Sequence, residues 1–518
     1  MNQLLQERVA RTAQSRAQET AIVMGSERLT YGELEQRSNM LARLLIDQGV
    51  RRGDRVCLMQ PKAPVAIVSM LATLKAGAVY IPVDIASPFA RVEKIVTAAD
   101  PRLLLASVHA SELLAQLRVD ARLISVDGAL DGSQCSFADA SAFEAAPLAT
   151  ITRPSDPAHI LFTSGSTGVP KGVIITHEMV DAFLHWALPY FGHRPGDRIS
   201  GHPPLHFDLS TFDIFGSLSS GAELHLVPGN VLLPNQLASF IRDAQLTQWF
   251  SVPSTFAYLA RGDAVGEGDY PSLERIIWCG EVLPPAVLRH WMRRVPQCSY
   301  TNLYGPTEAT IASSYYTVVS VPDDKTAAIP IGTPCAGEDI RVLDEALRPV
   351  PPGEIGELYI EGAGLSPGYW RDEEKTRAAF ICDPVTGRRL YRTGDLGRRD
   401  ADGLLHFVGR ADSQIKSRGY RIELGEIETA LTAVAGVAEC AVVGVPSETF
   451  DGTAICCAWV SRPDAELNPT RLRSSLAEML PTYMLPSRWL RLTELPKNAN
   501  GKTDRPALRQ RFAESSGP

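Results

Sequence analysis

Residues 160–172 read ILFTSGSTGVPKG, and VIITH follows directly. An apolar run ends at Phe162 and gives way to six consecutive small residues, 163–168, before a second apolar run begins at Val173. Short apolar runs bounded by glycine and proline are typical of buried strands. The stretch therefore predicts two buried strands joined by a loop of hydroxyl-bearing residues and glycines.

The loop between these strands has the composition of a phosphate-binding site. Glycine-rich turns bring backbone N–H groups close to phosphate oxygens, hydroxyls add further donors, and a lysine adds positive charge. A plain hairpin turn could have the same composition, so composition alone leaves both interpretations open. The candidate phosphate-binding residues are Thr163, Ser164, Gly165, Ser166, Thr167, Gly168 and Lys171.

The sequence does not match the phosphate-binding motif of a P-loop NTPase. The Walker A motif requires GxxxxGK followed by Ser or Thr. Gly501, Lys502 and Thr503 supply the end of that motif, but Pro496 occupies the position of its first glycine. A nucleotide bound by this chain would therefore be held by another scheme.

The length of the chain and the pattern of its apolar and polar residues predict two domains. At 518 residues it exceeds what one hydrophobic core usually supports. Strand-like runs such as 54–60 alternate with helical patterns such as 63–78, which indicates an α/β fold with parallel or mixed sheets flanked by helices. After about residue 330, alternating apolar and polar residues around prolines and a glycine predict a β-rich subdomain.

We expect a large N-terminal domain, residues 1–411, and a small mobile α+β C-terminal domain, residues 412–518. The elements expected in the second domain are helices at 425–434 and 470–480 and strands at 440–445 and 453–460.

Composition argues against several classes of protein. The net charge of −8 and the pI of about 5.8 argue against nucleic-acid binding. The nine cysteines lack metal-ligand spacing, so no zinc site is expected. No apolar run reaches the roughly 18 residues of a membrane-spanning helix. The N-terminus MNQLLQERVARTAQ is charged throughout and does not resemble a secretory signal, so we expect a cytoplasmic protein with reduced thiols.

The loop TSGSTGVPKG resembles the phosphate-loop signature of the adenylate-forming enzymes. That superfamily includes acyl- and aryl-CoA synthetases, luciferases and the adenylation domains of nonribosomal peptide synthetases. Nine further stretches, in the family's order, resemble the motif set of amino acid adenylation domains and extend over nearly the whole chain. They are LTYGEL (29–34), LKAGAVYIPVD (74–84), FDLS (207–210), NLYGPTE (302–308), GELYIEGAGLSPGYW (356–370), YRTGDL (391–396), GRADSQIKSRGYRIELGEIE (409–428), LPTYMLP (480–486) and NGKTDR (500–505).

The resemblance implies an AMP-forming amino acid–carrier protein ligase. Such an enzyme uses ATP and Mg²⁺ to convert an amino acid to aminoacyl-AMP with release of pyrophosphate. It then transfers the aminoacyl group to the phosphopantetheine thiol of a carrier protein. Because no carrier-like segment follows NGKTDR, we expect the carrier to be a separate polypeptide or a removed downstream domain.

The resemblance also assigns roles to nucleotide-binding residues. Lys502 matches the catalytic lysine, which meets the charge that builds on the α-phosphate, and Glu308 matches the Mg²⁺ ligand. Asp395 matches the carboxylate that accepts both ribose hydroxyls. The structural alternatives are a solvated lysine, a helix-capping glutamate and, for Tyr304, a core tyrosine. The other nucleotide-binding residues implied are Asn302, Tyr304, Gly305, Thr307, Phe407 and Arg410.

The resemblance assigns a second group of residues to the family's domain movement and to its transfer of the aminoacyl group to a thiol. Asp412 matches the hinge, which must absorb a large backbone change. Gly419 matches a residue that lines the pantetheine tunnel, where a side chain would block entry, and Lys416 lies on the same loop. Ser417 stands where the family usually has an aliphatic residue, which leaves the packing of this loop open.

Asp208, in FDLS, indicates the class of substrate. Amino-acid-activating members carry an aspartate here, which pairs with the α-ammonium group of the substrate. A buried carboxylate without a partner is costly, so a ligand cation would satisfy it; a helix N-cap is the structural alternative. The other amino-acid-binding positions, none of them charged, are Leu209, Phe212, Thr255, Ile277, Cys279, Leu303, Ile311 and Ala312.

These positions favour a small neutral L-α-amino acid, because an acidic or basic side chain would lie unpaired among them. The context PLHFDLSTFDIFG (204–216) resembles free-standing proline-activating ligases, and proline is our first expectation. Thr255, Cys279 and Ala312 depart from the proline pattern, so alanine, serine, cysteine, threonine and valine stay open.

Three other functions compete with this interpretation. A D-alanine–carrier protein ligase of cell-wall modification shares an FDLS-like motif and differs in the stereochemistry of its substrate. Asp208 argues against an acyl- or aryl-CoA ligase. The joint presence of Lys502, Glu308 and Asp395 argues against a catalytically silent nucleotide-binding scaffold.

Overall fold

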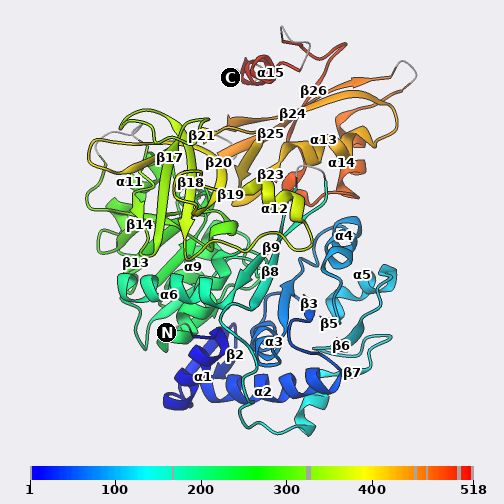
Figure 1. Ribbon diagram of the computed structural model, residues 1–518, viewed down its shortest axis with the longest axis vertical. Coiled ribbons are helices and arrows are strands. Elements are labelled where there is room, and N and C mark those ends of the chain that lie inside the picture. The colour runs from blue at the N-terminus through cyan, green and yellow to red at the C-terminus, as the bar shows by residue number, and fades with distance from the viewer. Residues whose placement is uncertain are drawn as a thin grey trace.

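The computed structural model describes residues 3–165, 168–322, 328–447, 452–462, 465–498 and 503–514. In these residues two large sheets lie side by side, and a smaller antiparallel sheet and a C-terminal α+β unit lie above them along the long axis of the molecule (Figure 1). The predicted fold class is confirmed: mixed sheets flanked by helices, a β-rich part and a smaller C-terminal part. No described helix is long and apolar enough to cross a membrane.

A seven-stranded sheet carries the hairpin that the opening stretch predicts. Its strands are parallel except for the last pair, β8 and β9, which run antiparallel and pair Thr163 with Lys171 across the loop. In spatial order the strands are β7 (Cys135–Ser136), β6 (Arg122–Ser125), β5 (Leu103–Ala106), β3 (Arg55–Met59), β4 (Val79–Pro82), β8 (Pro157–Thr163) and β9 (Lys171–Thr176).

A nine-stranded sheet forms the second layer. Its centre is parallel, and antiparallel strands complete both edges. In spatial order the strands are β16 (Thr333–Pro334), β15 (Ser314–Val318), β14 (Ser299–Tyr304), β13 (Arg275–Cys279), β12 (Gln248–Ser251), β10 (Arg198–Gly201), β11 (Glu223–Leu226), β1 (Thr20–Met24) and β2 (Glu27–Thr30).

The main core lies between these two sheets. Helix α3 (Pro64–Lys75) is buried over almost its whole circumference and contacts strands of both sheets, as expected for a helix that is apolar all round. Its Leu71 belongs to one apolar cluster with Leu58 of β3 and Ile22 of β1. The other helices that contribute to this core are α1 (Leu5–Ser15), α2 (Tyr31–Asp47) and α6 (His177–Phe191).

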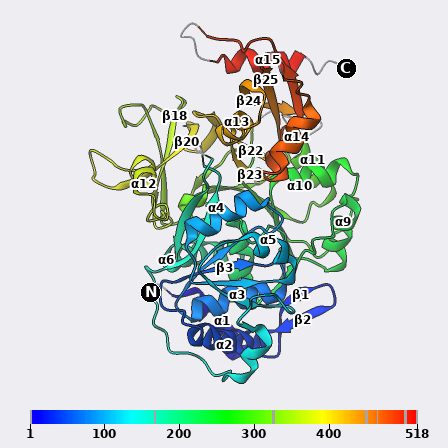
Figure 2. The same ribbon diagram turned by 90° about the vertical axis from the view of Figure 1, so that its right-hand side faces the viewer.

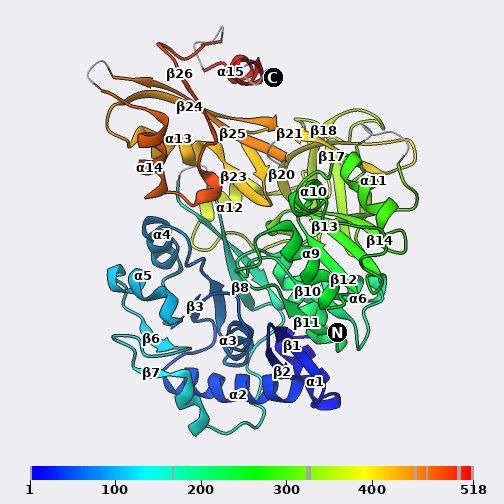
Figure 3. The ribbon, with the colours of Figure 1, turned by 180° about the vertical axis from the view of Figure 1, so that it is seen from behind.

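The outer faces of both sheets are covered by amphipathic helices. Helix α4 (Phe89–Ala99) packs on the seven-stranded sheet, with α5 (Ser111–Gln116) beside it (Figure 2). Helices α9 (Pro234–Asp243), α10 (Pro253–Arg261) and α11 (Pro285–Arg294) cover the nine-stranded sheet (Figure 3). The remaining short elements of these layers are η1 (Val108–Ala110), η2 (Phe137–Ala142), α7 (Leu209–Thr211), η3 (Phe212–Gly216), α8 (Ser217–Ser220) and η4 (Thr307–Ala309).

The β-rich part predicted after residue 330 is an antiparallel sheet. It pairs β17 with β18, β18 with β20, and β20 with both β19 and β21. The bounds are β17 (Glu338–Leu343), β18 (Gly356–Gly362), α12 (Glu373–Ala379), β19 (Phe380–Cys382), β20 (Arg389–Arg399) and β21 (Leu405–Arg410).

The C-terminal unit begins with a short hairpin and continues as a three-stranded sheet with a helical layer on each face. Successive residues of β24 point to opposite faces: Val442 packs with α13 and α14, whereas Val443 packs with α15. The predicted helices and strands of this unit are all present, with shifts of a few residues at their ends. They are β22 (Gln414–Ser417), β23 (Tyr420–Glu423), α13 (Leu424–Thr432), β24 (Val437–Ser447), β25 (Gly452–Ser461), α14 (Pro469–Ala477), η5 (Thr482–Met484), β26 (Arg488–Arg491) and α15 (Arg505–Glu514).

The central position of α3 makes its leucines decisive for stability. Leu71 has 0% of its surface exposed, so Leu71→Ala should lower the free energy of unfolding by about 2–5 kcal/mol through lost apolar contacts and a residual cavity. Leu232→Ala, at a side chain that is 71% exposed, is the matched control and should change it by less than about 0.5 kcal/mol. Urea denaturation measures both; equal effects would contradict the assigned core.

Candidate functional site

The phosphate-loop candidates lie at the end of β8, facing the C-terminal unit. Ser164 is buried and donates its Oγ hydrogen to the backbone carbonyl of Arg421, at 2.5 Å. Gly165 has no room for a side chain, because a Cβ atom there would lie 2.1 Å from the carbonyl oxygen of Val169. Thr163 has a buried hydroxyl with no hydrogen-bond partner among the described residues. Ser166 and Thr167 lie outside the described residues.

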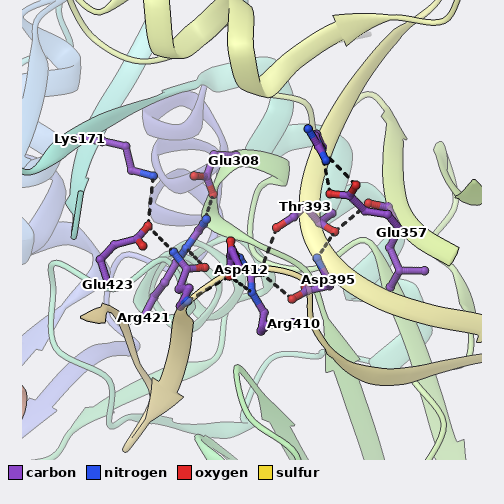
Figure 4. A network of polar contacts seen from close by, with 12 residues as sticks. Lys171, Glu308, Glu357, Thr393, Asp395, Arg410, Asp412, Arg421 and Glu423 are labelled. Atoms are coloured by element: carbon purple, nitrogen blue, oxygen red, sulfur yellow. Dashed lines mark hydrogen bonds and ion pairs between the residues drawn. The ribbon is translucent and has the colours of Figure 1, made fainter. Parts of the chain in front are cut away.

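Glu308, on η4, is completely buried and is held by groups from three segments of the chain. Arg421 of β23 donates Nη1–H to its Oε2 at 2.7 Å, and Tyr369 donates its hydroxyl to Oε1 at 2.8 Å. Burial alone would raise the pKa of Glu308, but the charges of Arg421 and Lys171 outweigh it and lower this pKa to about 2. Glu308 is therefore an ionised carboxylate in a low-dielectric cleft (Figure 4).

Asp395, on β20, forms a second buried carboxylate site. Its Oδ2 accepts the hydroxyl of Tyr304 at 2.7 Å and its Oδ1 accepts Nη1–H of Arg410 at 2.6 Å. Burial opposes ionisation, but the charges of Lys416 and Arg410 lower the pKa of Asp395 below its ordinary value. Arg410 also donates to both carboxylate oxygens of Asp412, at 3.0 and 2.6 Å, so one guanidinium joins the two acids (Figure 4).

The predicted adenine-binding residues line one cavity of 550 Å³. Asn302, Tyr304 and Phe407 lie in its wall, and Arg410 and Lys416 contribute positive charge. The Nζ atom of Lys416 lies 5.5 Å from the ring centre of Tyr304 and 5.9 Å from that of Phe407. The cavity thus combines flat aromatic walls, amide groups and cations, the features that a nucleotide requires.

Asp208 lies in a smaller cavity of 110 Å³ that adjoins these groups. The same cavity is lined by Ser164, Thr307, Asp395 and Lys416. Burial raises the pKa of Asp208 to about 6, and a hydrogen bond with the Thr307 side chain limits the rise. The structure therefore brings the FDLS aspartate, the phosphate loop and the YRTGDL aspartate into one space.

The other predicted amino-acid-binding residues are divided among four places. Leu209 and Cys279 line the cavity that contains Asp208. Leu303 lines the 550 Å³ cavity, and Thr255 lines a third cavity of 520 Å³ whose wall includes Tyr420. The remaining four are buried in the apolar core cluster that also contains Leu209 and Cys279: Phe212, Ile277, Ile311 and Ala312. In this arrangement the eight positions do not form one continuous pocket.

The predicted hairpin residues of the C-terminal unit reach the same cleft. Gly419 lines the Asp208 cavity and packs on Val252, because a Cβ atom at this glycine would lie 2.5 Å from Val252 Cγ1. Ser417 is buried and donates its hydroxyl to the carbonyl of Thr453, so the loop accommodates the departure from an aliphatic residue. Lys502 lies outside the described residues.

Sequence reasoning missed two residues of the cleft. Arg421 and Tyr369 hold Glu308 from elements far away in the chain. Each lies inside a quoted motif, GYRIE and SPGYW, but nothing in the motif says which carboxylate it contacts. The signal that could have identified Arg421 is its position between two apolar strand residues. An arginine in such a place is buried only if it has a charged partner.

The residues of the cleft fit a magnesium ion held together with a nucleotide. Mg²⁺ prefers one or two carboxylates plus phosphate oxygens and water, and ionised Glu308 provides one carboxylate beside the phosphate loop. The described residues contain no group of three or more His, Cys, Asp or Glu side chains that could form an all-protein metal cage.

Comparisons with known proteins identify the family to which this chain belongs. The model of the AMP-binding enzyme family matches residues 9–370, and that of the AMP-binding enzyme C-terminal domain matches residues 426–502. The chain therefore belongs to the AMP-binding enzyme family, as its motifs predict.

Individual relatives are adenylation proteins of several kinds. L-proline–(L-prolyl-carrier protein) ligase of Streptomyces coelicolor is 36% identical over 93% of this chain and 92% of its own length. Tyrocidine synthase 3 of Brevibacillus parabrevis is 34% identical over 98% of this chain, but the chain spans only 8% of that synthase. The Vibrio cholerae adenylation domain AlmE, solved with glycyl-adenosine-5'-phosphate, superposes with a TM-score of 0.85 at 26% identity over 98% of both chains.

The pairing of Arg410 with buried Asp395 predicts a measurable loss of stability. Arg410→Gln removes the guanidinium from the Asp395 carboxylate, which is 3% exposed. The free energy of unfolding at pH 7 should therefore fall by about 3–5 kcal/mol. Since the pKa of Asp395 is lowered in the folded state, its ionised form stabilises the fold above the unfolded-state pKa, and this contribution disappears on acidification. The difference from wild type should therefore shrink below about pH 4.

Urea midpoints at pH 7 and at lower pH measure this effect. Arg348→Gln, which breaks an ion pair whose arginine is 76% exposed, is the control and should cost less than about 1 kcal/mol. A loss for Arg410→Gln that does not change with pH would show that the carboxylate is not the partner responsible.

Proposed function

We propose that this protein activates a small neutral L-α-amino acid with ATP, releasing pyrophosphate, and transfers the aminoacyl group of aminoacyl-AMP to the phosphopantetheine thiol of a separate carrier protein. One observation carries the proposal: Asp208 is a buried carboxylate that forms no ion pair within the described part of the chain, in the cavity that also contains Ser164, Asp395 and Lys416. An α-ammonium group would supply the missing charge and would bring the substrate carboxylate towards the nucleotide.

The nucleotide would occupy the 550 Å³ cavity. Tyr304 and Phe407 would flank the adenine, Asn302 would meet its polar edge, and Asp395 would accept the ribose hydroxyls in place of its present donors. Lys171 and the phosphate loop would meet the phosphates. Mg²⁺ on Glu308 would neutralise phosphate charge.

Two positions of the C-terminal domain, residues 412–518, against residues 1–411 would separate the two half-reactions. For adenylation Lys502 would approach the α-phosphate, and for thiol transfer the β22–β23 hairpin with Lys416 and Gly419 would enter the cleft. The hairpin contacts described above support the second position. Asp412, tied to Arg410 between β21 and β22, is the proposed hinge.

Proline is the substrate that we favour. The 36% identity to a proline ligase over most of both chains supports it, and so do the apolar Leu209 and Cys279 beside Asp208. A bound acidic or basic side chain would lose its hydration without gaining a partner there.

ATP–pyrophosphate exchange across the proteinogenic L-amino acids and D-alanine tests the proposal directly. We expect exchange with one small neutral L-amino acid, and its loss in Lys502→Ala. Exchange with D-alanine alone would favour the cell-wall ligase, acyl-CoA formation from a plain acid would favour the CoA ligase, and no exchange with any of these amino acids would overturn the proposed function.

The pKa of Asp208 predicts how amino acid binding depends on pH. Only the ionised carboxylate attracts an ammonium group, so the KM for the amino acid should rise as the pH falls below about 6, whereas the KM for ATP should not follow it. Asp208→Asn should raise the amino acid KM by about tenfold or more, the value of a lost charge-assisted hydrogen bond, and should abolish this pH dependence.

Asp213→Asn is the matched control for that substitution. Asp213 is also buried, and burial raises its pKa above the ordinary value, but it is not among the residues that line the Asp208 cavity, so its amide variant should keep the wild-type pH profile. Equal losses of amino acid and ATP binding in Asp208→Asn would contradict the ammonium role.

Gly419 predicts a separation of the two half-reactions. In Gly419→Ala the new Cβ atom would meet Val252 at 2.5 Å and keep the hairpin out of the cleft. Transfer to the carrier thiol should fall by at least about tenfold, the effect of a misplaced site, while pyrophosphate exchange persists. Gly403→Ala has a similar positive φ, 84° against 79°, but no atom within 4 Å, and should leave both reactions unchanged. A parallel loss of exchange and transfer in Gly419→Ala would contradict this role.

A further inference from the structure

Arg421 forms an ion pair with Glu308, the carboxylate that the proposed function assigns to the metal. Its Nη1 lies 2.7 Å from Oε2 of Glu308, and the carboxylate is 0% exposed. The two residues come from η4 and from β23 of the C-terminal hairpin, 113 positions apart in the chain. The contact therefore exists only while the hairpin is inserted in the cleft.

The hairpin fixes the guanidinium rather than leaving it as a flexible surface charge. Arg421 donates Nε–H to Oε1 of Gln414 at 2.8 Å, and Gln414 in turn donates to Glu423 at 2.6 Å. The backbone carbonyl of Arg421 accepts the hydroxyl of Ser164 in the phosphate loop. These bonds hold the cation against Glu308 (Figure 4).

Both oxygens of Glu308 are engaged in this arrangement. Tyr369 donates to Oε1 while Arg421 donates to Oε2. A divalent cation bound at about 2.1 Å would have to displace the guanidinium from Oε2, because two cations on one buried oxygen repel each other strongly in a low-dielectric site.

We propose that Arg421 and a divalent cation are alternative occupants of Glu308, so that insertion of the β22–β23 hairpin and binding of the metal–nucleotide complex exclude each other. This inference rests on the metal role of Glu308 in the proposed function. By linkage, hairpin insertion must weaken metal binding by the same factor by which the metal weakens insertion. Loss of the metal with pyrophosphate would then free Glu308 for Arg421.

The chain offers a matched control in a buried ion pair that lies away from this interface. Arg275 of β13 lies 2.7 Å from Asp197, with side-chain exposures of 7% and 1%. Arg275→Gln removes a buried guanidinium from the nine-stranded sheet and leaves Glu308, Arg421 and the contacts of the hairpin untouched. It separates the general loss of a buried cation from a vacated metal ligand.

The experiment compares the affinity for α,β-methylene-ATP with Mn²⁺ and in EDTA, in the full chain and its variants. Calorimetry measures the nucleotide, and electron paramagnetic resonance counts the free Mn²⁺. In Arg421→Gln the ratio of the two affinities should shift about tenfold towards the Mn²⁺ complex, the factor expected if one tenth of the wild-type molecules have Glu308 free. In Arg275→Gln the ratio should stay at the wild-type value.

Two outcomes would overturn the inference: an unchanged ratio in Arg421→Gln, or the same shift in Arg275→Gln. Arg421→Met keeps the apolar stem without the charge and should reproduce the shift, with circular dichroism confirming that each variant is folded. The assay needs no amino acid. Failure of every amino acid in pyrophosphate exchange would therefore overturn the proposed function, whereas an unchanged ratio would overturn only the competition at Glu308.

Discussion

The compensation of charge inside a buried cleft is the constraint on which the rest of this structure depends. Glu308, Asp395 and Asp208 are all buried where the large sheets meet the C-terminal unit. The first two have an arginine within hydrogen-bonding distance and a lowered pKa, whereas burial raises the pKa of Asp208. Ionised side chains are tolerated in such a place only with a partner, so in the proposed function Asp208, which forms no ion pair among the described residues, receives the cationic group of the substrate.

The same arginines connect the parts of the molecule. Arg410 joins the nucleotide-side acid Asp395 to the proposed hinge residue Asp412, and Arg421 joins the C-terminal hairpin to Glu308. A change of charge in the cleft therefore alters the contacts that position the C-terminal unit. In the proposed function, binding and domain position are coupled because they use the same few charges.

Local patterns predicted most of the fold. The apolar runs around the phosphate loop are β8 and β9, the apolar helix at 63–78 is α3, and the C-terminal helices and strands lie within a few residues of their expected positions. The resemblance to the family's motifs also singled out Asp208, Glu308 and Asp395, whose side chains the structure brings to one cleft. These signals are local: strand and helix periodicity, glycine-rich turns and short motifs each depend on neighbours in the chain.

The sequence by itself determined the order of the elements, the family and the identity of the acids and hydroxyls available to a nucleotide. Only the tertiary structure decided that Arg421 meets Glu308, that Thr255 lines a different cavity from Asp208, and that Phe212 and Ile311 are buried in the apolar core. The reason is physical. A pKa, an ion pair and the wall of a cavity depend on groups brought together from distant segments, and chain spacing does not encode those distances.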